Sequence, residues 1–269
     1  MNLSFFPSPY LLWSVGVQKL NMPVKRRRAP TNPIESANRK RDEDFIRDHL
    51  QQPSADRTSW THPATKKTYT LALKSPAKMS VDEMQACFDM VEYTSGADYR
   101  ASSWGWKPAA KIKEMRSPEL RYVLVKEGDS ERLCGFTSLM PTFEEGEAVV
   151  YCYEIHLLEE LRGTGMGRKL MDYLVSVAES IPIVEKVMLT CFVANKAARG
   201  FYEKLGFERD ATSPVERKLR FGKVFVPDYV IMSRKIQRRE GGQVDSQDGG
   251  GDVEAEVVDG VKKSKRNDS

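Results

Sequence analysis

A strand, a glycine-rich turn and a helix follow one another without interruption in the middle of this chain. Residues 149–157 read VVYCYEIHL, an apolar run with one carboxylate inside it. Glycines at 163, 165 and 167 follow, and residues 167–180 carry apolar residues at helical spacing. A helix start presents free backbone N–H groups and the positive end of the helix dipole, and glycine lets an anion approach that backbone closely. This order of elements predicts a phosphate-binding site.

Two common nucleotide-binding loops do not fit these glycines. A Walker loop needs a Gly-Lys-Ser/Thr ending, which residues 162–167 (RGTGMG) lack. A dinucleotide fingerprint needs a different glycine spacing and an acidic residue after the next strand. Taken alone, the glycines also fit a plain tight turn.

Charge is distributed unevenly over the 269 residues. Residues 1–70 hold 12 Lys/Arg and 6 Asp/Glu, residues 71–239 hold 26 and 24, and residues 240–269 hold 4 and 8. A near-neutral body argues against a globally basic nucleic-acid binder. We expect a disordered basic arm, a helical extension, one catalytic domain and a disordered acidic tail, at residues 1–33, 34–67, 68–237 and 238–269.

Neither a metal site nor a membrane segment is indicated. The four cysteines form no Cys-x-x-Cys pair and the three histidines have no ligand spacing, so we expect no metal and reduced thiols. The first 20 residues lack a basic n-region, and Met22 offers a second start, so we expect residues 1–21 to be an artefact of start-site choice or a dispensable extension. The run KRRR at 25–28 fits a nuclear signal or a solvated basic arm.

Hydrophobic periodicity predicts one mixed, mostly antiparallel α/β (α+β) sheet flanked by helices. We expect an aromatic-rich loop, containing Tyr99 and Trp104, after a helix that opens at Ser80 with a capping box. The expected strands are 68–74, 121–128, 132–140, 148–157, 186–193, one from Phe207, and 229–236. The expected helices are 34–52, the one from Ser80, 109–116, 167–180 and one after Asn195.

Two motifs together resemble the GNAT (GCN5-related) acetyltransferases. Arg162-Gly-Thr-Gly-Met-Gly matches the family's Arg/Gln-x-x-Gly-x-Gly/Ala loop, and residues 195–207 resemble the second half of its signature. The resemblance covers about residues 70–236. It implies the GNAT fold and acetyl-CoA as co-substrate, with the pyrophosphate held at this loop.

Longer strings resemble the NatD family of histone N-alpha-acetyltransferases. They are Trp104-Gly-Trp-Lys, Tyr151-Cys-Tyr-Glu and Lys186-Val-Met-Leu-Thr. This resemblance implies acetyl transfer to the N-terminal amine of histone 4 and histone 2A tails, which begin Ser-Gly-Arg-Gly. We expect a monomer in the nucleus and cytoplasm that binds these tails, with no membrane attachment and no direct nucleic-acid binding.

The resemblance places the catalytic acidic residue at Glu154. An α-amine has a pKa near 7.7–8.0, so a modest base is sufficient. We expect burial to raise the pKa of Glu154; the alternative is a buried salt bridge. In a strict strand Tyr151 and Tyr153 share one face and Glu154 lies on the other. A β-bulge would bring them together.

Further site residues follow from the same resemblance. Tyr153 is expected to assist proton transfer and Tyr202 to protonate the leaving thiolate, with aromatic packing as the alternative for both. Expected cofactor contacts are Ile155, His156, Leu157, Arg162, Gly163, Thr164, Gly165, Met166, Gly167 and Asn195. Expected substrate contacts are Tyr99, Trp104, Glu144, Tyr151, Thr190 and Tyr229.

Several of these residues keep a second interpretation. Glu144 is expected to pair with the substrate arginine, or else to lie in a solvated turn before Gly146. Thr190 also fits an ordinary strand residue, and His156 is a minor alternative base. Nothing near Cys152 in the sequence would lower its pKa, so we expect direct attack in a ternary complex.

Two other functions remain open at the level of sequence. One is a GNAT enzyme that acetylates protein lysines or a small amine. The other is a non-catalytic chromatin-binding module that uses the KRRR arm, which predicts salt-dependent DNA binding and no CoA affinity.

Overall fold

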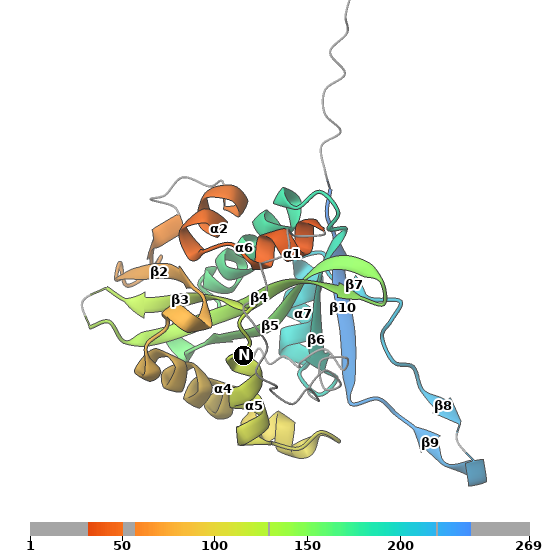
Figure 1. Ribbon diagram of the computed structural model, residues 1–269. Coiled ribbons are helices and arrows are strands. Elements are labelled where there is room, and N and C mark those ends of the chain that lie inside the picture. The colour runs from red at the N-terminus through yellow and green to blue at the C-terminus, as the bar shows by residue number, and fades with distance from the viewer. Residues whose placement is uncertain (1–31, 51–56, 129, 219, 238–269) are drawn as a thin grey trace, which may run out of the picture. The chain divides into compact units, whose positions relative to one another are not determined.

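The computed structural model describes residues 32–50, 57–128, 130–218 and 220–237. Their centre is an eight-stranded sheet in the order β1-β2-β3-β4-β5-β6-β10-β7, shown in Figure 1. A separate two-stranded ribbon joins β8 and β9. The strands are β1 (Ser59–Thr61), β2 (Thr68–Lys74), β3 (Arg121–Glu127), β4 (Leu133–Glu144), β5 (Glu147–Leu157), β6 (Lys186–Phe192), β7 (Glu208–Arg209), β8 (Arg217–Lys218), β9 (Val224–Phe225) and β10 (Tyr229–Lys235).

Neighbouring strands of the large sheet are antiparallel except for one parallel pair, β5 and β6. The parallel pair needs a crossover connection, which the helix between the two strands supplies. Its register runs from Val149–Lys186 to Cys152–Leu189. Both strands continue past that point, so they diverge there and open the sheet at its centre.

Helices cover both faces of the sheet (Figure 1). They are α1 (Pro33–Asn38), α2 (Asp42–His49), α4 (Val81–Ala101), α5 (Pro108–Met115), α6 (Met166–Ser180) and α7 (Lys196–Lys204), with short 3-10 turns at Pro76–Lys78, Glu159–Leu161 and Arg220–Gly222. Buried residues of α1, α2, α6 and α7 share one hydrophobic core. Those of α4 and α5 share the other. None of the described helices is both long and apolar enough to cross a bilayer.

Local sequence accounts for the helix ends. Ser80 accepts a hydrogen bond from the backbone of Glu83, whose side chain accepts one from the backbone of Ser80, and this capping box starts α4. The stripe of apolar residues on α6 forms its buried face. Gly206, at φ +82°, follows the last turn of α7 in the left-handed conformation that commonly ends a helix.

The predicted fold class is confirmed: the sheet is mixed, mostly antiparallel and flanked by helices. Two local predictions were wrong. Residues 34–52 do not form one helix, because α1 ends at Asn38 and α2 begins at Asp42. Tyr99 does not lie in a loop, because α4 continues to Ala101.

Some features were missed or lie outside the described residues. The edge strand β1 and the β8–β9 ribbon are too short to show periodicity. The predicted arm (1–33, apart from its last two residues) and the predicted tail (238–269) lie outside the described residues. The domain limits at 34–67 and 68–237 stay predictions.

Candidate active site

A bulge in β5 determines the geometry around Glu154. In the antiparallel register of β4 and β5, Ser138 lies opposite Glu154 and Leu139 lies opposite Cys152. Tyr153 is therefore an extra residue on β5 with no counterpart on β4. Such a bulge shifts the alternation of side chains by one position.

The bulge places both tyrosines and Glu154 on one face of the sheet. Tyr151 and Tyr153 belong to the core under α4 and α5, with ring centres 5.2 Å apart. Glu154 contacts a lysine of α5 on that same face. Cys152 and Ile155 belong to the core on the opposite face. In a strictly alternating strand Glu154 would lie on the face opposite to Tyr151 and Tyr153. The bulge brings it to the same face.

Glu154 is 1% exposed and both of its carboxylate oxygens are engaged. Oε1 accepts a hydrogen bond from Lys111 Nζ at 2.8 Å, and Oε2 lies 2.6 Å from His156 Nε2. The other ring nitrogen, Nδ1, lies 2.6 Å from the Thr94 hydroxyl. The Thr94 hydroxyl also donates to the Met90 carbonyl at 2.7 Å, so α4 holds Thr94 in place beside the ring.

The charge state of Glu154 differs from the sequence expectation. Burial raises the pKa of Glu154, but the nearby charge of Lys111 and the hydrogen bond from His156 outweigh it and hold that pKa below its ordinary value. The expectation of a raised pKa was wrong because it considered burial without the neighbours. Glu154 is therefore an ionised carboxylate at neutral pH, held in the buried salt bridge that the alternative interpretation anticipated.

The glycine-rich loop is held at the end of β5. Arg162 Nε donates to the Leu157 carbonyl at 3.0 Å, and the Thr164 hydroxyl donates to the Leu161 carbonyl at 2.7 Å. Gly165, at φ +99°, is the N-cap of α6. A Cβ atom added at Gly163 or Gly165 would meet no heavy atom within 4 Å, so the space over the loop is open.

Gly167 has a different role in the same loop. A Cβ atom there would lie 3.0 Å from the Phe201 ring on α7, which is too close for an ordinary contact. The glycine therefore lets α6 and α7 pack closely behind the loop. An open turn at a helix N-terminus, beside the divergence of β5 and β6, suits a phosphate group.

The remaining predicted cofactor and thiolate contacts lie around that divergence. Ile155, His156 and Leu157 lie on β5 beyond its last pair with β6. The Asn195 side chain accepts a hydrogen bond from the Ala198 backbone at 3.1 Å and so caps α7. Tyr202 is fully buried in α7 and packs edge-on against Phe207.

A pocket of about 210 Å³ is lined by three of the six predicted substrate residues, Glu144, Tyr151 and Tyr229. Its lining consists of Glu144, Glu145, Tyr151, Met188, Thr212, Pro214, Tyr229 and Ile231. Thr190 Oγ1 lies 2.5 Å from the hydroxyl of Tyr151, and Trp104 packs edge-on against Tyr229 with ring centres 5.5 Å apart. Glu144 is buried at the end of β4, so it is not in a solvated turn.

Tyr99 does not line this pocket. It is a buried residue of α4 whose ring lies 5.0 Å from Lys111 Nζ, 5.3 Å from the Trp106 ring and 5.3 Å from the Phe192 ring. Its position is beside the ammonium group that binds Glu154. Tyr99 therefore supports the carboxylate's surroundings in this structure.

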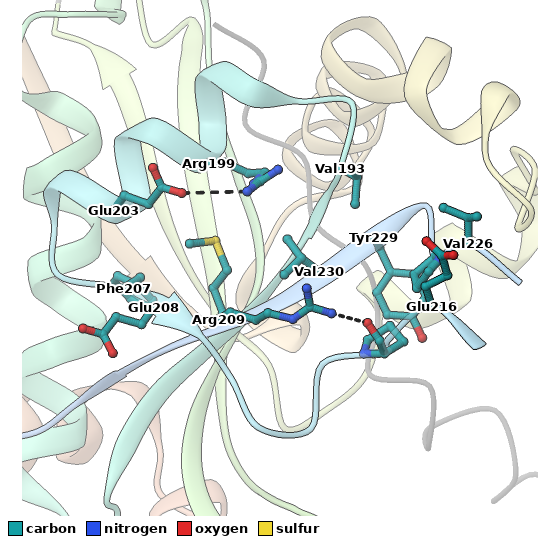
Figure 2. Close-up of a pocket in the computed structure, with 13 residues that line it drawn as sticks. Val193, Arg199, Glu203, Phe207, Glu208, Arg209, Glu216, Val226, Tyr229 and Val230 are labelled. Carbon is teal, nitrogen blue, oxygen red and sulfur yellow. Dashed lines mark hydrogen bonds and ion pairs between the residues drawn. The ribbon is translucent and has the colours of Figure 1, made fainter. Parts of the chain in front are cut away.

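A larger cavity of about 610 Å³, shown in Figure 2, adjoins the first pocket and shares Pro214 and Tyr229 with it. It lies among α7, β7, β10 and the segment between β7 and β10. Arg199 pairs with Glu203 at 3.9 Å, and Arg209 donates to the carbonyl of Pro214. Sequence reasoning missed the segment between β7 and β10, which carries no helical or strand periodicity.

Sequence reasoning also missed Lys111 and Thr94. Lys111 lies on the buried side of α5, four residues before the buried Met115. This helical spacing from an apolar residue was the signal in the sequence that could have predicted a buried lysine. Thr94 lies on the buried side of α4. Among the described residues, no group of three or more His, Cys, Asp or Glu side chains is arranged to hold a metal ion.

Comparison with known families gives one match. The model of the Acetyltransferase (GNAT) family matches residues 81–207. This range contains the bulge, Glu154, the glycine-rich loop and α7.

The curated proteins that are similar in sequence include two N-alpha-acetyltransferases. N-alpha-acetyltransferase 40 of Saccharomyces cerevisiae is 37% identical over 157 residues, which are 49% of this chain and 53% of that protein. N-alpha-acetyltransferase RimI of Mycobacterium tuberculosis is 29% identical over 132 residues, which are 48% of this chain and 75% of that protein. The chain thus spans about half the length of the yeast relative.

The solved structures that are similar to this chain include the ribosomal-protein-S18-alanine N-acetyltransferase of Escherichia coli. It is 16% identical with a TM-score of 0.43, over 65% of this chain and 99% of that chain. The structure of Arabidopsis thaliana NAA60 in complex with a bisubstrate analogue is 14% identical with a TM-score of 0.43. The match covers 62% of this chain and 98% of that chain.

Proposed function

Since the model of the Acetyltransferase (GNAT) family matches residues 81–207, we propose that this chain is an N-alpha-acetyltransferase that uses acetyl-CoA. We propose as its substrates the N-terminal tails of histone 4 and histone 2A, which begin Ser-Gly-Arg-Gly. The observation that carries the activity is the bulge at Tyr153. It places an ionised carboxylate, Glu154, on the same face as Tyr151, which lines the smaller pocket.

Acetyl transfer to an amine requires a neutral amine, because a protonated one has no lone pair. Glu154 accepts the amine proton directly or through one water molecule. An α-amine needs only a modest base, whereas a lysine with a pKa near 10.4 would need a stronger one. A carboxylate whose pKa lies below its ordinary value suits the α-amine better than a lysine.

The other residues bind and orient the reactants. The N-terminus of α6, with Gly163 and Gly165, holds the pyrophosphate, and acetyl-CoA supplies the acetyl group. Tyr151, Tyr229 and Glu144 surround the start of the peptide, and the buried Glu144 carboxylate pairs with the substrate arginine. Tyr202 donates a proton to the leaving thiolate.

Histone tails as substrates are supported by two features. One is the similarity of Trp104-Gly-Trp-Lys and Tyr151-Cys-Tyr-Glu to the NatD family. The other is the pair of acids, Glu144 and Glu145, at the pocket. Location in the nucleus and cytoplasm is part of this proposal and rests on the basic run at residues 25–28.

The test uses two peptides that begin Ser-Gly-Arg-Gly-Lys, one with a free α-amine and one with that amine blocked. We expect acetyl transfer to the free peptide alone, and Glu154→Gln should lower kcat by at least about 100-fold. Glu179→Gln, an exposed acid of α6 that lines neither pocket, is the control and should retain the same kcat. Transfer to the blocked peptide would instead identify a lysine acetyltransferase.

A further inference from the structure

A buried cluster of charges surrounds the carboxylate of Glu154. The Lys111 side chain is 4% exposed, and its Nζ lies 2.8 Å from Glu154 Oε1 and 2.9 Å from Glu114 Oε1. The same ammonium group lies 5.0 Å from the centre of the Tyr99 ring. Helix α5 thus contributes one cation and one anion to a site whose reacting carboxylate belongs to β5.

Burying the charged side chain of Lys111 lowers the stability of the fold, so a lysine at this position suggests that its charge is needed. Its neighbour one turn later on the buried side of α5, Met115, is apolar, and an apolar residue at 111 would avoid burying an ion. Burial lowers the pKa of Lys111, but Glu114 and Glu154 outweigh it and hold that pKa well above its ordinary value. Lys111 is therefore a permanent cation.

We propose that Lys111 is a positioning residue for acetyl transfer: its ammonium group keeps the buried Glu154 carboxylate charged and determines the orientation of Oε1. The proposal rests on the proposed role of Glu154 as the base. Without a cation beside it, a fully buried carboxylate takes up a proton and can no longer accept one from the substrate amine.

The other groups around Glu154 do not replace Lys111. They are Glu114 of α5, Tyr99 of α4, Tyr122 of β3, Cys152 and His156 of β5, and Tyr202 of α7. Among these described groups, His156 is the one besides Lys111 that can be positively charged. It occupies the other carboxylate oxygen, Oε2, and Thr94 holds its ring in place. Oε1 is therefore oriented by Lys111.

The experiment measures the pH dependence of acetyl transfer to the free Ser-Gly-Arg-Gly-Lys peptide. In Lys111→Met the acidic limb of the kcat profile should move to higher pH by about 1–3 units. The rate below that limb should fall about tenfold for each unit of the shift. Lys111→Arg keeps a cation and should restore most of the original profile. Lys113→Met removes an exposed lysine of the same helix and should leave the profile unchanged.

A second readout does not depend on activity. The carboxyl carbon of Glu154, labelled with ¹³C, is assigned from the NMR signal that disappears in Glu154→Gln. Its titration should move to higher pH in Lys111→Met. If Lys111→Met fails to fold, Lys111→Met combined with Glu114→Gln removes one charge of each sign and serves in its place.

The two proposals fail in different ways. If the wild-type protein transfers acetyl to the free peptide, but Glu154 titrates at the same pH with and without Lys111, the proposal for Lys111 is overturned alone. If the wild-type protein transfers acetyl to no amine, the proposed function is overturned. The proposed role of Lys111 in the reaction is then overturned as well.

Discussion

Tyr153 carries a buried, unsatisfied hydroxyl in the candidate site. Its side chain is 1% exposed, and its hydroxyl has no hydrogen-bond partner among the described residues. Nearby tyrosines differ: Tyr151 contacts Thr190, and Tyr122 donates to the Met115 carbonyl at 2.7 Å. Since buried polar groups are nearly always paired, this unpaired hydroxyl at the bulge supports the proposed role of Tyr153 in proton transfer.

Replacing Tyr153 with Phe separates catalysis from stability. The hydroxyl makes no hydrogen bond among the described residues, so its removal should leave the melting temperature unchanged or slightly higher. If the hydroxyl takes part in proton transfer, kcat should fall by about 100-fold while KM changes little. Steady-state kinetics and calorimetry on the same preparation check both, and an unchanged kcat would assign Tyr153 to packing.

At the scale of elements, the glycine-rich loop connects the end of β5 to the start of α6. Gly165 adopts φ +99°, a left-handed conformation that a side chain disfavours, and the loop is bonded to the end of β5 through Arg162. Gly206 adopts φ +82° at the end of α7, away from the loop. Both glycines therefore adopt a positive φ, but Gly165 lies in the glycine-rich loop and Gly206 lies outside it.

This comparison gives a matched pair of variants. Gly165→Ala and Gly206→Ala should each lower the free energy of unfolding by about 1–2 kcal/mol, since alanine disfavours positive φ. Acetyl-CoA binding, measured by titration calorimetry, should weaken by about tenfold or more in Gly165→Ala and stay unchanged in Gly206→Ala. Equal affinity of both variants would contradict a role for the loop in binding.

For the whole described molecule, the N-terminal helices are part of the domain's packing. Ile34 of α1 and Phe45 of α2 lie in the core shared with α6. Arg121 Nη2 donates to the Asn38 and Lys40 carbonyls at 3.1 and 2.8 Å, and so ties α1 and the turn after it to β3. His49, the last residue of α2, donates from Nδ1 to the Ser180 hydroxyl of α6 at 2.8 Å.

These contacts make stability depend on pH through His49. Burial, followed by the charge of Lys40, lowers the pKa of His49 from 6.5 to about 4. Between those values the unfolded chain binds a proton that the folded protein does not, so stability is lost as the pH falls from 6.5 to 4. His49→Gln should show a smaller loss of melting temperature over that interval. Parallel curves for the two proteins, measured by calorimetry from pH 7 to pH 4, would contradict this prediction.

Most elements of the fold could be predicted from the sequence because they depend on near neighbours. The strand at 68–74 matches β2, and the capping box at Ser80 starts α4 as expected. Apolar spacing similarly located α6, and the glycines placed the loop before it. In each case the residues that decide the structure lie within a few positions of one another.

The sequence by itself determined that a carboxylate, two tyrosines and a glycine turn stand next to one another in one strand–turn–helix unit. Only the tertiary structure decided how they act together. The bulge at Tyr153 arises from pairing with β4, and it reverses the face on which Glu154 lies. Lys111, 43 residues earlier in the chain, acts with His156 to reverse the direction of the pKa shift that burial alone predicts for Glu154. Both effects depend on partners that spacing along the chain does not reveal, because electrostatic and hydrogen-bond energies follow distance in space.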